Sequence, residues 1–312
     1  MQPKIATIKT ISDVNEVFRK LDLRRRDFFR DDIILIENTG IRYDQDFVGS
    51  ISFGTNLKKL SINNGVTKVP FVTREKQLVR NESNTLTQII ADDRVLSKMV
   101  FEFRELEIQL ERFSNNFFAE THRVVHPNIS FRFCRTDDEG LHFDTYKTGK
   151  AGMFPKGRRS FKIFLNVDLK PRIWNIGPKL TDFVSATKDN LPTLCPASVN
   201  TFCYIVDKIG LLDDVSVERV EIPPGGMIIA NGTTVAHQVI FGERMICFES
   251  GVVALPGQKT VSSEQEDFDR VVQKEGIKVV DHIANFDDYV RMDGSLDRAK
   301  RRLESYSGSL ID

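Results

Sequence analysis

The pattern of apolar and polar residues divides the chain into three regions. Between residues 91 and 120, apolar residues recur at spacings of three and four, with charged residues between them. This spacing predicts an amphipathic scaffold helix that packs against a sheet. The apolar positions are Val95, Met99, Phe103, Leu106, Leu110 and Phe113. Upstream, the run DIILIE at residues 32–37 is typical of a strand.

The region from 129 to 255 has a different pattern. Short segments rich in Ile, Val and Phe are interrupted by Gly, Pro and Asn-Gly, which is typical of strands joined by tight turns. The segments are ISFRFC, LHFDTY, SFKIFLNV, PRIWNIG, VERVEI, GMIIA, AHQVIF and RMICFES. Eight short strands predict a jelly roll or barrel. From Ser262 onward the pattern returns to helix, over 264–275 and again over 296–306.

These regions predict an α+β fold that is mainly β, with a jelly-roll, cupin-like core and flanking helices. We expect a single catalytic domain over residues 1–312. Within it, residues 1–128 form an N-terminal α/β scaffold segment, 129–255 the β core, and 256–312 a C-terminal helical extension.

Composition narrows the classes of function. The 312 residues carry a formal net charge of zero, which gives no reason to expect a nucleic-acid partner. No apolar run is long enough for a transmembrane segment, and residues 1–10 lack the apolar core of a secretory signal. The four cysteines include no CxxC pair. We therefore expect a cytoplasmic protein with free thiols.

One short motif carries metal-binding chemistry. In a strand, His142 and Asp144 point to the same face because they are two residues apart. They supply two of the three ligands of a 2-His-1-carboxylate facial triad. The candidate third ligand, His237, lies downstream, after PPGG (223–226), a short apolar run and Asn-Gly. Each half of this site also has an alternative interpretation without a metal. His142 could be a strand-edge histidine that merely lies near Asp144, and His237 could be a histidine packed in the core.

The register around His237 suggests a partner for a dicarboxylic acid. If Gly242 and Glu243 form a hairpin turn, His237 faces Phe248, and Arg244 shares the face of His237. The separation along the strands is then about 13 Å. A short dicarboxylic acid and an extended arginine could span that gap, with the guanidinium holding the far carboxylate.

Taken in order, these motifs resemble the Fe(II)/2-oxoglutarate dioxygenase superfamily. The set comprises His142-x-Asp144, Phe-Leu-Asn at 164–166, PPGG, His237 and Arg244. The resemblance implies a double-stranded β-helix core, Fe(II) held by the two histidines and the aspartate, and 2-oxoglutarate bound by Arg244. It also implies O2 as a reactant and ascorbate as a supporting reductant. Arg244 follows His237 sooner than in many relatives, and Ile246 replaces a common hydroxyl residue.

A narrower resemblance covers residues 158–177, which are similar to a segment of bacterial Kdo hydroxylases. Those enzymes hydroxylate the 3-deoxy-octulosonic acid (Kdo) sugar of lipopolysaccharide. The resemblance implies a small-molecule or glycolipid substrate. A lipid-linked substrate would place the cytoplasmic protein at the periphery of the inner membrane.

Other residues are candidates for binding. Lys162 and Asn166 share a strand face, where they would line a co-substrate pocket or, alternatively, face solvent. Arg159 and Arg172 could clamp an acidic substrate, although arginines on loops often have no specific role. Tyr146 lies in a Gly-rich, basic loop that is either a lid or a plain surface loop.

For three further residues we expect structural roles rather than functional ones. Trp174 is expected to pack rather than to stack on substrate. His122 and His126 are expected near a helix end, as capping or surface residues.

The sequence thus predicts a hydroxylase that acts on an unactivated C–H bond of a small polar substrate. Asp144, in place of Gly or Ala, favours hydroxylation over halogenation. Three alternatives remain: a cupin-type metal enzyme without 2-oxoglutarate, a hydroxylase of an amino acid or natural-product intermediate, and a non-catalytic jelly-roll binding module.

Overall fold

The computed structural model describes five long stretches of the chain, residues 33–52, 92–133, 140–145, 154–189 and 195–280. It also describes short pieces at 3, 5–10, 57–61, 71–73, 78–79 and 191. The fold is mixed α+β and mainly β, as predicted. No helix in these stretches is long and apolar enough to cross a membrane.

A large sheet forms one wall of the molecule, and its strands come from distant parts of the sequence. In spatial order they are β1 (Ile5–Thr10), β2 (Ile33–Asn38), β11 (Met227–Ala230), β7 (Arg158–Asn166), β13 (Arg244–Ala254), β6 (His122–Phe133), β3 (Leu57–Ser61), β4 (Phe71–Thr73) and β5 (Leu78–Val79). All pairs are antiparallel except β1 with β2. The N-terminal segment therefore contributes strands to the same sheet as the predicted core.

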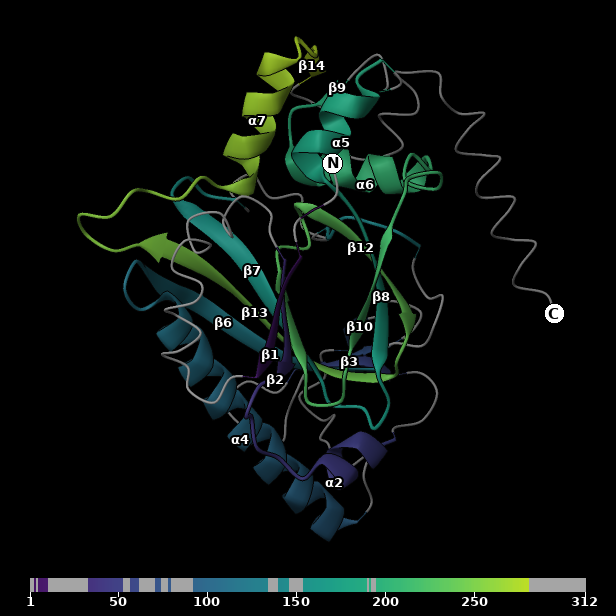
Figure 1. Ribbon diagram of the computed structural model, residues 1–312, viewed down its shortest axis with the longest axis vertical. Helices are drawn as coiled ribbons and strands as arrows, with labels where there is room; N and C mark the ends of the chain where they lie inside the picture. The colour runs from purple at the N-terminus through teal and green to yellow at the C-terminus, as the bar shows by residue number, and fades with distance from the viewer. Residues whose placement is uncertain are drawn as a thin grey trace, which may run out of the picture.

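A smaller sheet faces the large one (Figure 1). It contains β10 (Glu218–Ile222), β8 (Arg172–Lys179) and β12 (Val235–Phe241), all antiparallel. One buried apolar cluster takes side chains from both sheets, for example Trp174 and Ile176 from β8 and Phe164 and Cys247 from the large sheet. The space between the sheets is therefore the interior in which the site is built. A separate two-stranded ribbon pairs β14 (Val279–Val280) with β9 (Cys195–Pro196).

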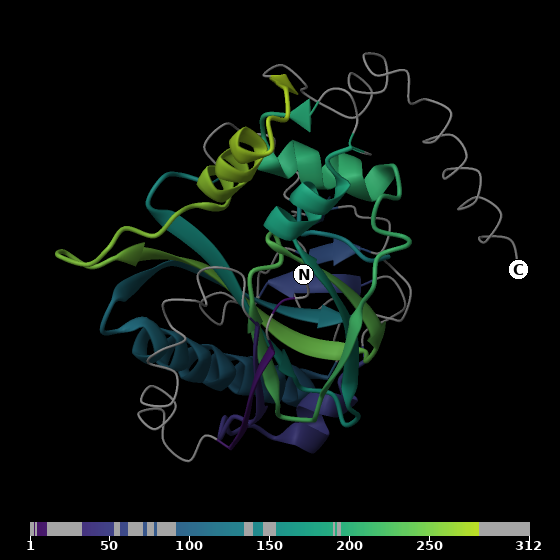
Figure 2. The same ribbon diagram turned by 45° about the horizontal axis from the view of Figure 1, so that its top comes forward.

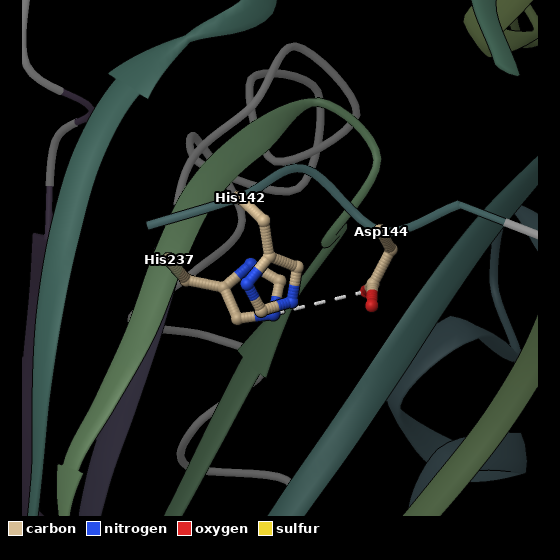
Figure 3. Close-up of side chains that lie close together, drawn as sticks. All are labelled: His142, Asp144 and His237. Atoms are coloured by element: carbon tan, nitrogen blue, oxygen red, sulfur yellow. Dashed lines mark ion pairs between the residues drawn. The ribbon is translucent and has the colours of Figure 1, made fainter. Parts of the chain in front are cut away.

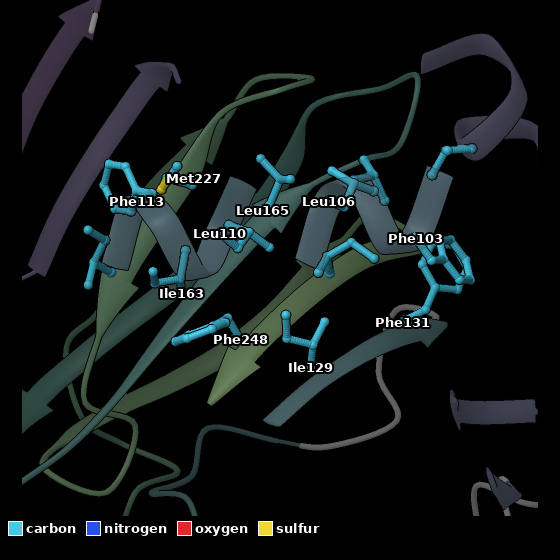
Figure 4. Packing of buried hydrophobic residues seen from close by; sticks show 14 of the residues in the cluster. Phe103, Leu106, Leu110, Phe113, Ile129, Phe131, Ile163, Leu165, Met227 and Phe248 are labelled. Atoms are coloured by element: carbon cyan, nitrogen blue, oxygen red, sulfur yellow. The ribbon is translucent and has the colours of Figure 1, made fainter. Parts of the chain in front are cut away.

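The opposite face of the large sheet is covered by the helix α4 (Asp93–Phe118), as predicted. Figure 4 shows Phe103, Leu106 and Leu110 of α4 against apolar side chains of the sheet. Burying such side chains stabilises the fold by about 1.5–3 kcal/mol each. Val95 is the exception to the predicted apolar face, because it is 39% exposed.

The remaining helices gather at one end of the two sheets (Figure 2), apart from α2 (Gln45–Ser50). They are α5 (Leu180–Thr187), α6 (Val199–Lys208) and α7 (Glu264–Lys274), and they share a buried apolar cluster. Sequence analysis predicted α7 but neither α5 nor α6. A capping box between Ser263 and Glu266 fixes the start of α7. The predicted helix over 296–306 lies outside the described residues.

Two local predictions are wrong. The placement of His122 and His126 at a helix end is wrong, because α4 ends at Phe118 and both residues belong to strand β6. The predicted surface role holds for His126, which is exposed, but not for His122, which is buried. A strand was also predicted over 141–146; its described residues, 141–145, form no continuous strand, and among them only His142 takes part in a β-bridge.

The predicted hairpin between β12 and β13 is also wrong in its pairing. Gly242 does make the turn, with φ of 116°, a conformation that favours glycine. However, β12 pairs with β8 in the small sheet, whereas β13 pairs with β7 and β6 in the large one. The chain therefore crosses from one wall to the other at this turn, and His237 does not face Phe248 as a strand partner.

Candidate metal centre

Backbone hydrogen bonds bring two distant segments together at the site. His142 and His237 form an antiparallel bridge, with N–O distances of 3.1 and 2.9 Å. Two residues later, the amide of Asp144 donates to the carbonyl of Gly232 at 2.8 Å. The segment holding His142 and Asp144 is thus fixed against β12 and the turn that precedes it.

Both imidazole rings are oriented by their own neighbouring backbone. Nδ1 of His142 lies 2.8 Å from the carbonyl oxygen of Gly140, and Nδ1 of His237 lies 3.1 Å from that of Val235. A carbonyl oxygen can only accept, so each Nδ1 donates a proton. With Nδ1 occupied in this way, Nε2 is the nitrogen of each ring that can bind a metal.

The three predicted ligands converge. One ligand atom each from His142, Asp144 and His237 can be chosen so that all three lie within 4.8 Å of one another. Nε2 of His237 is 3.9 Å from Oδ2 of Asp144, and Figure 3 shows both rings and the carboxylate turned toward one another. Two imidazoles and one carboxylate are the donor set of the facial triad that binds non-haem iron. The residues therefore fit a divalent transition metal.

The charge states of two ligands also suit a metal. Burial lowers the pKa of His237 to about 4, so its imidazole is neutral at neutral pH. Burial alone would raise the pKa of Asp144, but the neighbouring ammonium of Lys162 helps to hold it well below its ordinary value. The site thus offers a neutral imidazole and a charged carboxylate.

Because Gly232 has no side chain, the ligands can occupy the space beside its Cα atom. A Cβ atom at this position would lie 1.7 Å from Oδ2 of Asp144 and 2.9 Å from Cε1 of His237. Any other residue would displace the carboxylate. Sequence analysis identified Asn231-Gly232 only as a turn, because the close approach of Asp144 depends on a residue 88 positions upstream of Gly232.

Lys162 contacts the ligand carboxylate directly. Its Nζ lies 2.8 Å from Oδ2 of Asp144 and 3.0 Å from Oε1 of Glu249, its neighbour across the β7–β13 pair. Glu249 also forms ion pairs with Arg132 at 2.6 Å and Lys59 at 3.4 Å. The lysine that we predicted to line a co-substrate pocket therefore lies at the site, where it holds the aspartate.

Asn166 shares the inner face with Lys162 but has a different role from the one predicted. Its amide donates to the carbonyls of Lys170 and Ile222, and its Oδ1 accepts from the amide of Asp168. These bonds close the connection between β7 and β8. Asn166 therefore supports the turn.

Arg244 does not share the face of His237. It alternates with Met245 and Cys247, which lie in the cluster between the sheets, so it belongs to the opposite face. Its guanidinium lies 3.5 Å from Asp168 and donates to the carbonyl of Ile51 at 2.6 Å. The register argument that placed it beside His237 fails because β12 and β13 lie in different sheets.

Of the three predicted substrate residues, Arg159 and Tyr146 do not add to the described site. Arg159 alternates with Lys162 on β7 and forms an ion pair with Asp267 of α7, on the outer side of the sheet. Tyr146 lies outside the described residues.

Arg172 and Trp174 line the interior beside His237. The indole ring of Trp174 stacks on the imidazole of His237, with centroids 5.4 Å apart and planes at 20°. Arg172 is two residues away on the same face of β8 and is completely buried. Its side chain fills the space beside Gly242, where a Cβ would meet Cγ of Arg172 at 2.8 Å.

Comparisons with known proteins find solved structures of similar fold, but no match in sequence. No protein-family profile matches the chain, and no curated protein matches it in sequence. Among solved structures, the chain is similar to the Kdo hydroxylase KdoO, a non-haem Fe(II), α-ketoglutarate-dependent dioxygenase.

The complex of KdoO with succinate and Fe(III) is 14% identical, with a TM-score of 0.58 over 88% of this chain and 96% of that chain. The complex with α-ketoglutarate and Fe(III) is 15% identical, with a TM-score of 0.58 over 89% and 98%. This likeness shows that the two chains share a fold.

Proposed function

We propose that the chain is an Fe(II)/2-oxoglutarate-dependent oxygenase that hydroxylates a C–H bond of a small polar substrate. The observation that carries the proposal is the convergence of two histidines and one aspartate within 4.8 Å. The two facing sheets then correspond to a double-stranded β-helix, and the fold shared with KdoO supports this reading.

In this proposal His142, Asp144 and His237 would hold the iron through two imidazole nitrogens and one carboxylate oxygen. Bound iron supplies the redox chemistry that couples oxidation of 2-oxoglutarate by O2, to succinate and carbon dioxide, with oxidation of the substrate. Lys162 keeps the Asp144 carboxylate oriented, through the 2.8 Å contact.

Arg172 is the residue best placed to hold the far carboxylate of 2-oxoglutarate. His237 pairs with Ile176 of β8, and Arg172 lies four residues earlier on the same face. The separation along the strand is about 13 Å. A co-substrate bound at the metal and an extended arginine side chain together cover that distance, and a guanidinium can hold a carboxylate through two hydrogen bonds.

Trp174 lies between these two points and carries a suitable donor. Its indole N–H is buried, and among the described residues no acceptor lies within hydrogen-bond distance of it. An indole nitrogen can only donate, so it favours an anionic or carbonyl oxygen in the interior. The co-substrate supplies such oxygens.

The substrate that we propose for testing is the Kdo sugar of lipopolysaccharide. Two observations support it: the resemblance of residues 158–177 to Kdo hydroxylases and the fold shared with KdoO. The shared segment includes β7, which carries Lys162, and the start of β8, which carries Arg172.

Succinate release tests the proposal. Purified protein supplied with Fe(II), ascorbate and 2-oxoglutarate should release succinate, and release should rise with the true substrate in a panel that includes Kdo-lipid A. His142→Ala should abolish stoichiometric iron binding and succinate release together. Iron binding unaffected by His142→Ala would refute the metal site. Iron-dependent turnover of a panel member without 2-oxoglutarate would instead support a cupin-type enzyme.

A further inference from the structure

Glu264 is a buried carboxylate that lies outside both sheets, in the first turn of α7. Its side chain is completely buried. Oε1 accepts two hydrogen bonds, from the amide of Ser160 at 2.7 Å and from Nδ2 of Asn231 at 2.7 Å. It therefore ties α7 to β7 and to the turn that follows β11.

The turn held by Glu264 contains Gly232, which lies against the proposed ligand Asp144. Asn231 also donates to the carbonyl of Ser160 at 2.9 Å, and its Oδ1 accepts from the amide of Thr233 at 3.1 Å. These contacts fix the residues on both sides of Gly232. The carbonyl of Gly232 in turn accepts the amide of Asp144 at 2.8 Å.

The start of α7 does not itself require Glu264. Ser263 and Glu266 form a complete capping box, in which the side chain of each residue accepts a hydrogen bond from the backbone amide of the other. A buried carboxylate is costly unless its hydrogen bonds compensate, and among the described residues Oε2 of Glu264 has no hydrogen-bond partner. Without this side chain the amide of Ser160 would lose its acceptor and Nδ2 of Asn231 would lose one of its two, so Glu264 fixes the 231–233 turn against β7.

We infer that Glu264 is a positioning residue of the metal centre. It holds the 231–233 turn so that Gly232 stays against Asp144, and it thereby makes α7 a part of the site. This inference rests on the proposed function, because it assumes that Asp144 is a metal ligand. It assigns a role to a residue 120 positions after that ligand.

Cobalt(II) affinity, measured on the metal-free protein without co-substrate or substrate, tests this role. Glu264→Met removes the acceptor with little change in volume and should weaken Co(II) binding by about 10- to 100-fold, as loss of outer contacts to a metal ligand does. Glu264→Gln keeps an acceptor oxygen, so its Co(II) affinity and visible Co(II) spectrum should remain close to those of the wild type.

Glu266→Met is the matched control in the same helix turn. It breaks the capping box, so it should lower the melting temperature while leaving Co(II) affinity and the Co(II) spectrum unchanged. If Glu264→Met acted only through stability, it would behave like this control.

Wild-type Co(II) affinity in a folded Glu264→Met protein would overturn the inference. If that variant does not fold, Asn231→Asp breaks the same contact from the other side. It keeps the acceptor for Thr233 but sets a carboxylate against Glu264, and it should weaken Co(II) binding at least as much. Unchanged Co(II) affinity in Asn231→Asp would likewise overturn the inference. Wild-type protein that binds no Co(II) would instead refute the proposed function.

Discussion

Gly232 illustrates how a single residue can be required for space rather than for backbone conformation. Its Cβ position is already taken by Oδ2 of Asp144, at 1.7 Å. Gly242 is the opposite case, because its φ of 116° is itself unfavourable for other residues. The two glycines are indistinguishable in sequence, since both occur in turn-like contexts.

Gly232→Ala should therefore weaken metal binding strongly without unfolding the protein. The added methyl group displaces the Asp144 carboxylate, so we expect the Co(II) or Fe(II) dissociation constant to rise by more than about 100-fold. Calorimetric titration measures this change. Gly257→Ala is the control, because its Cβ would meet nothing within 4 Å; it should cost only backbone strain and leave metal binding intact. Tight binding by Gly232→Ala would contradict the ligand geometry.

The three ligands were predictable because their spacing and order were informative. His142 and Asp144 do point into one site, although the reason differs from the one predicted. The pairing of the two segments orients them, through contacts of His142 with His237 and of Asp144 with Gly232, rather than the alternation of a continuous strand. Trp174 and Glu264 were not predicted as site residues, because burial beside a ligand depends on the folded arrangement.

At the scale of elements, the turn between β12 and β13 marks the limit of sequence reasoning. Its position at Gly242 was predicted, but two consecutive strands joined by a tight turn were assumed to pair. Each instead finds its hydrogen bonds with strands of its own sheet, β8 and β7 respectively. The same geometric argument, a basic residue about four positions from the histidine, then selects Arg172 instead of Arg244.

Arg172→Met and Arg244→Met should consequently have different effects. If Arg172 holds the far carboxylate, its loss should raise the KM for 2-oxoglutarate by about 100-fold, the order expected for a lost charge-assisted contact. Arg244→Met should lower stability through its contacts with Asp168 and Ile51, with little change in that KM. Uncoupled succinate formation gives both values without knowledge of the substrate. If instead Arg244→Met raised the KM for 2-oxoglutarate and Arg172→Met did not, Arg244 would be the residue that holds the far carboxylate.

At the scale of the whole molecule, one charged cluster joins four strands of the large sheet. Glu249 of β13 lies among Lys162 of β7, Arg132 of β6 and Lys59 of β3. Burial would raise the pKa of Glu249, but the three cations hold it well below its ordinary value of 4.5. The unfolded chain therefore binds a proton more readily than the folded one as the pH falls below 4.5.

The stability contributed by Glu249 should accordingly be present above its unfolded pKa and be lost in acid. Glu249→Gln should lower the free energy of unfolding of the metal-free protein at about pH 7 and flatten its decline toward about pH 3. Urea unfolding across this range measures both effects. Glu243→Gln, whose side chain is 62% exposed, should change little at neutral pH. An acid dependence that remains as steep in Glu249→Gln would exclude this cluster as its source.

The order of strands in the large sheet has a consequence for the way the protein is made. Strand β2 lies between β1 and β11, where Ile36 pairs with Met227. During synthesis, the first strands emerge long before their partner on that side has been translated. Apolar strand edges that wait for a distant partner are prone to associate with other chains. We therefore expect a ribosome-bound nascent chain to need protection, such as a chaperone, until β11 has left the exit tunnel.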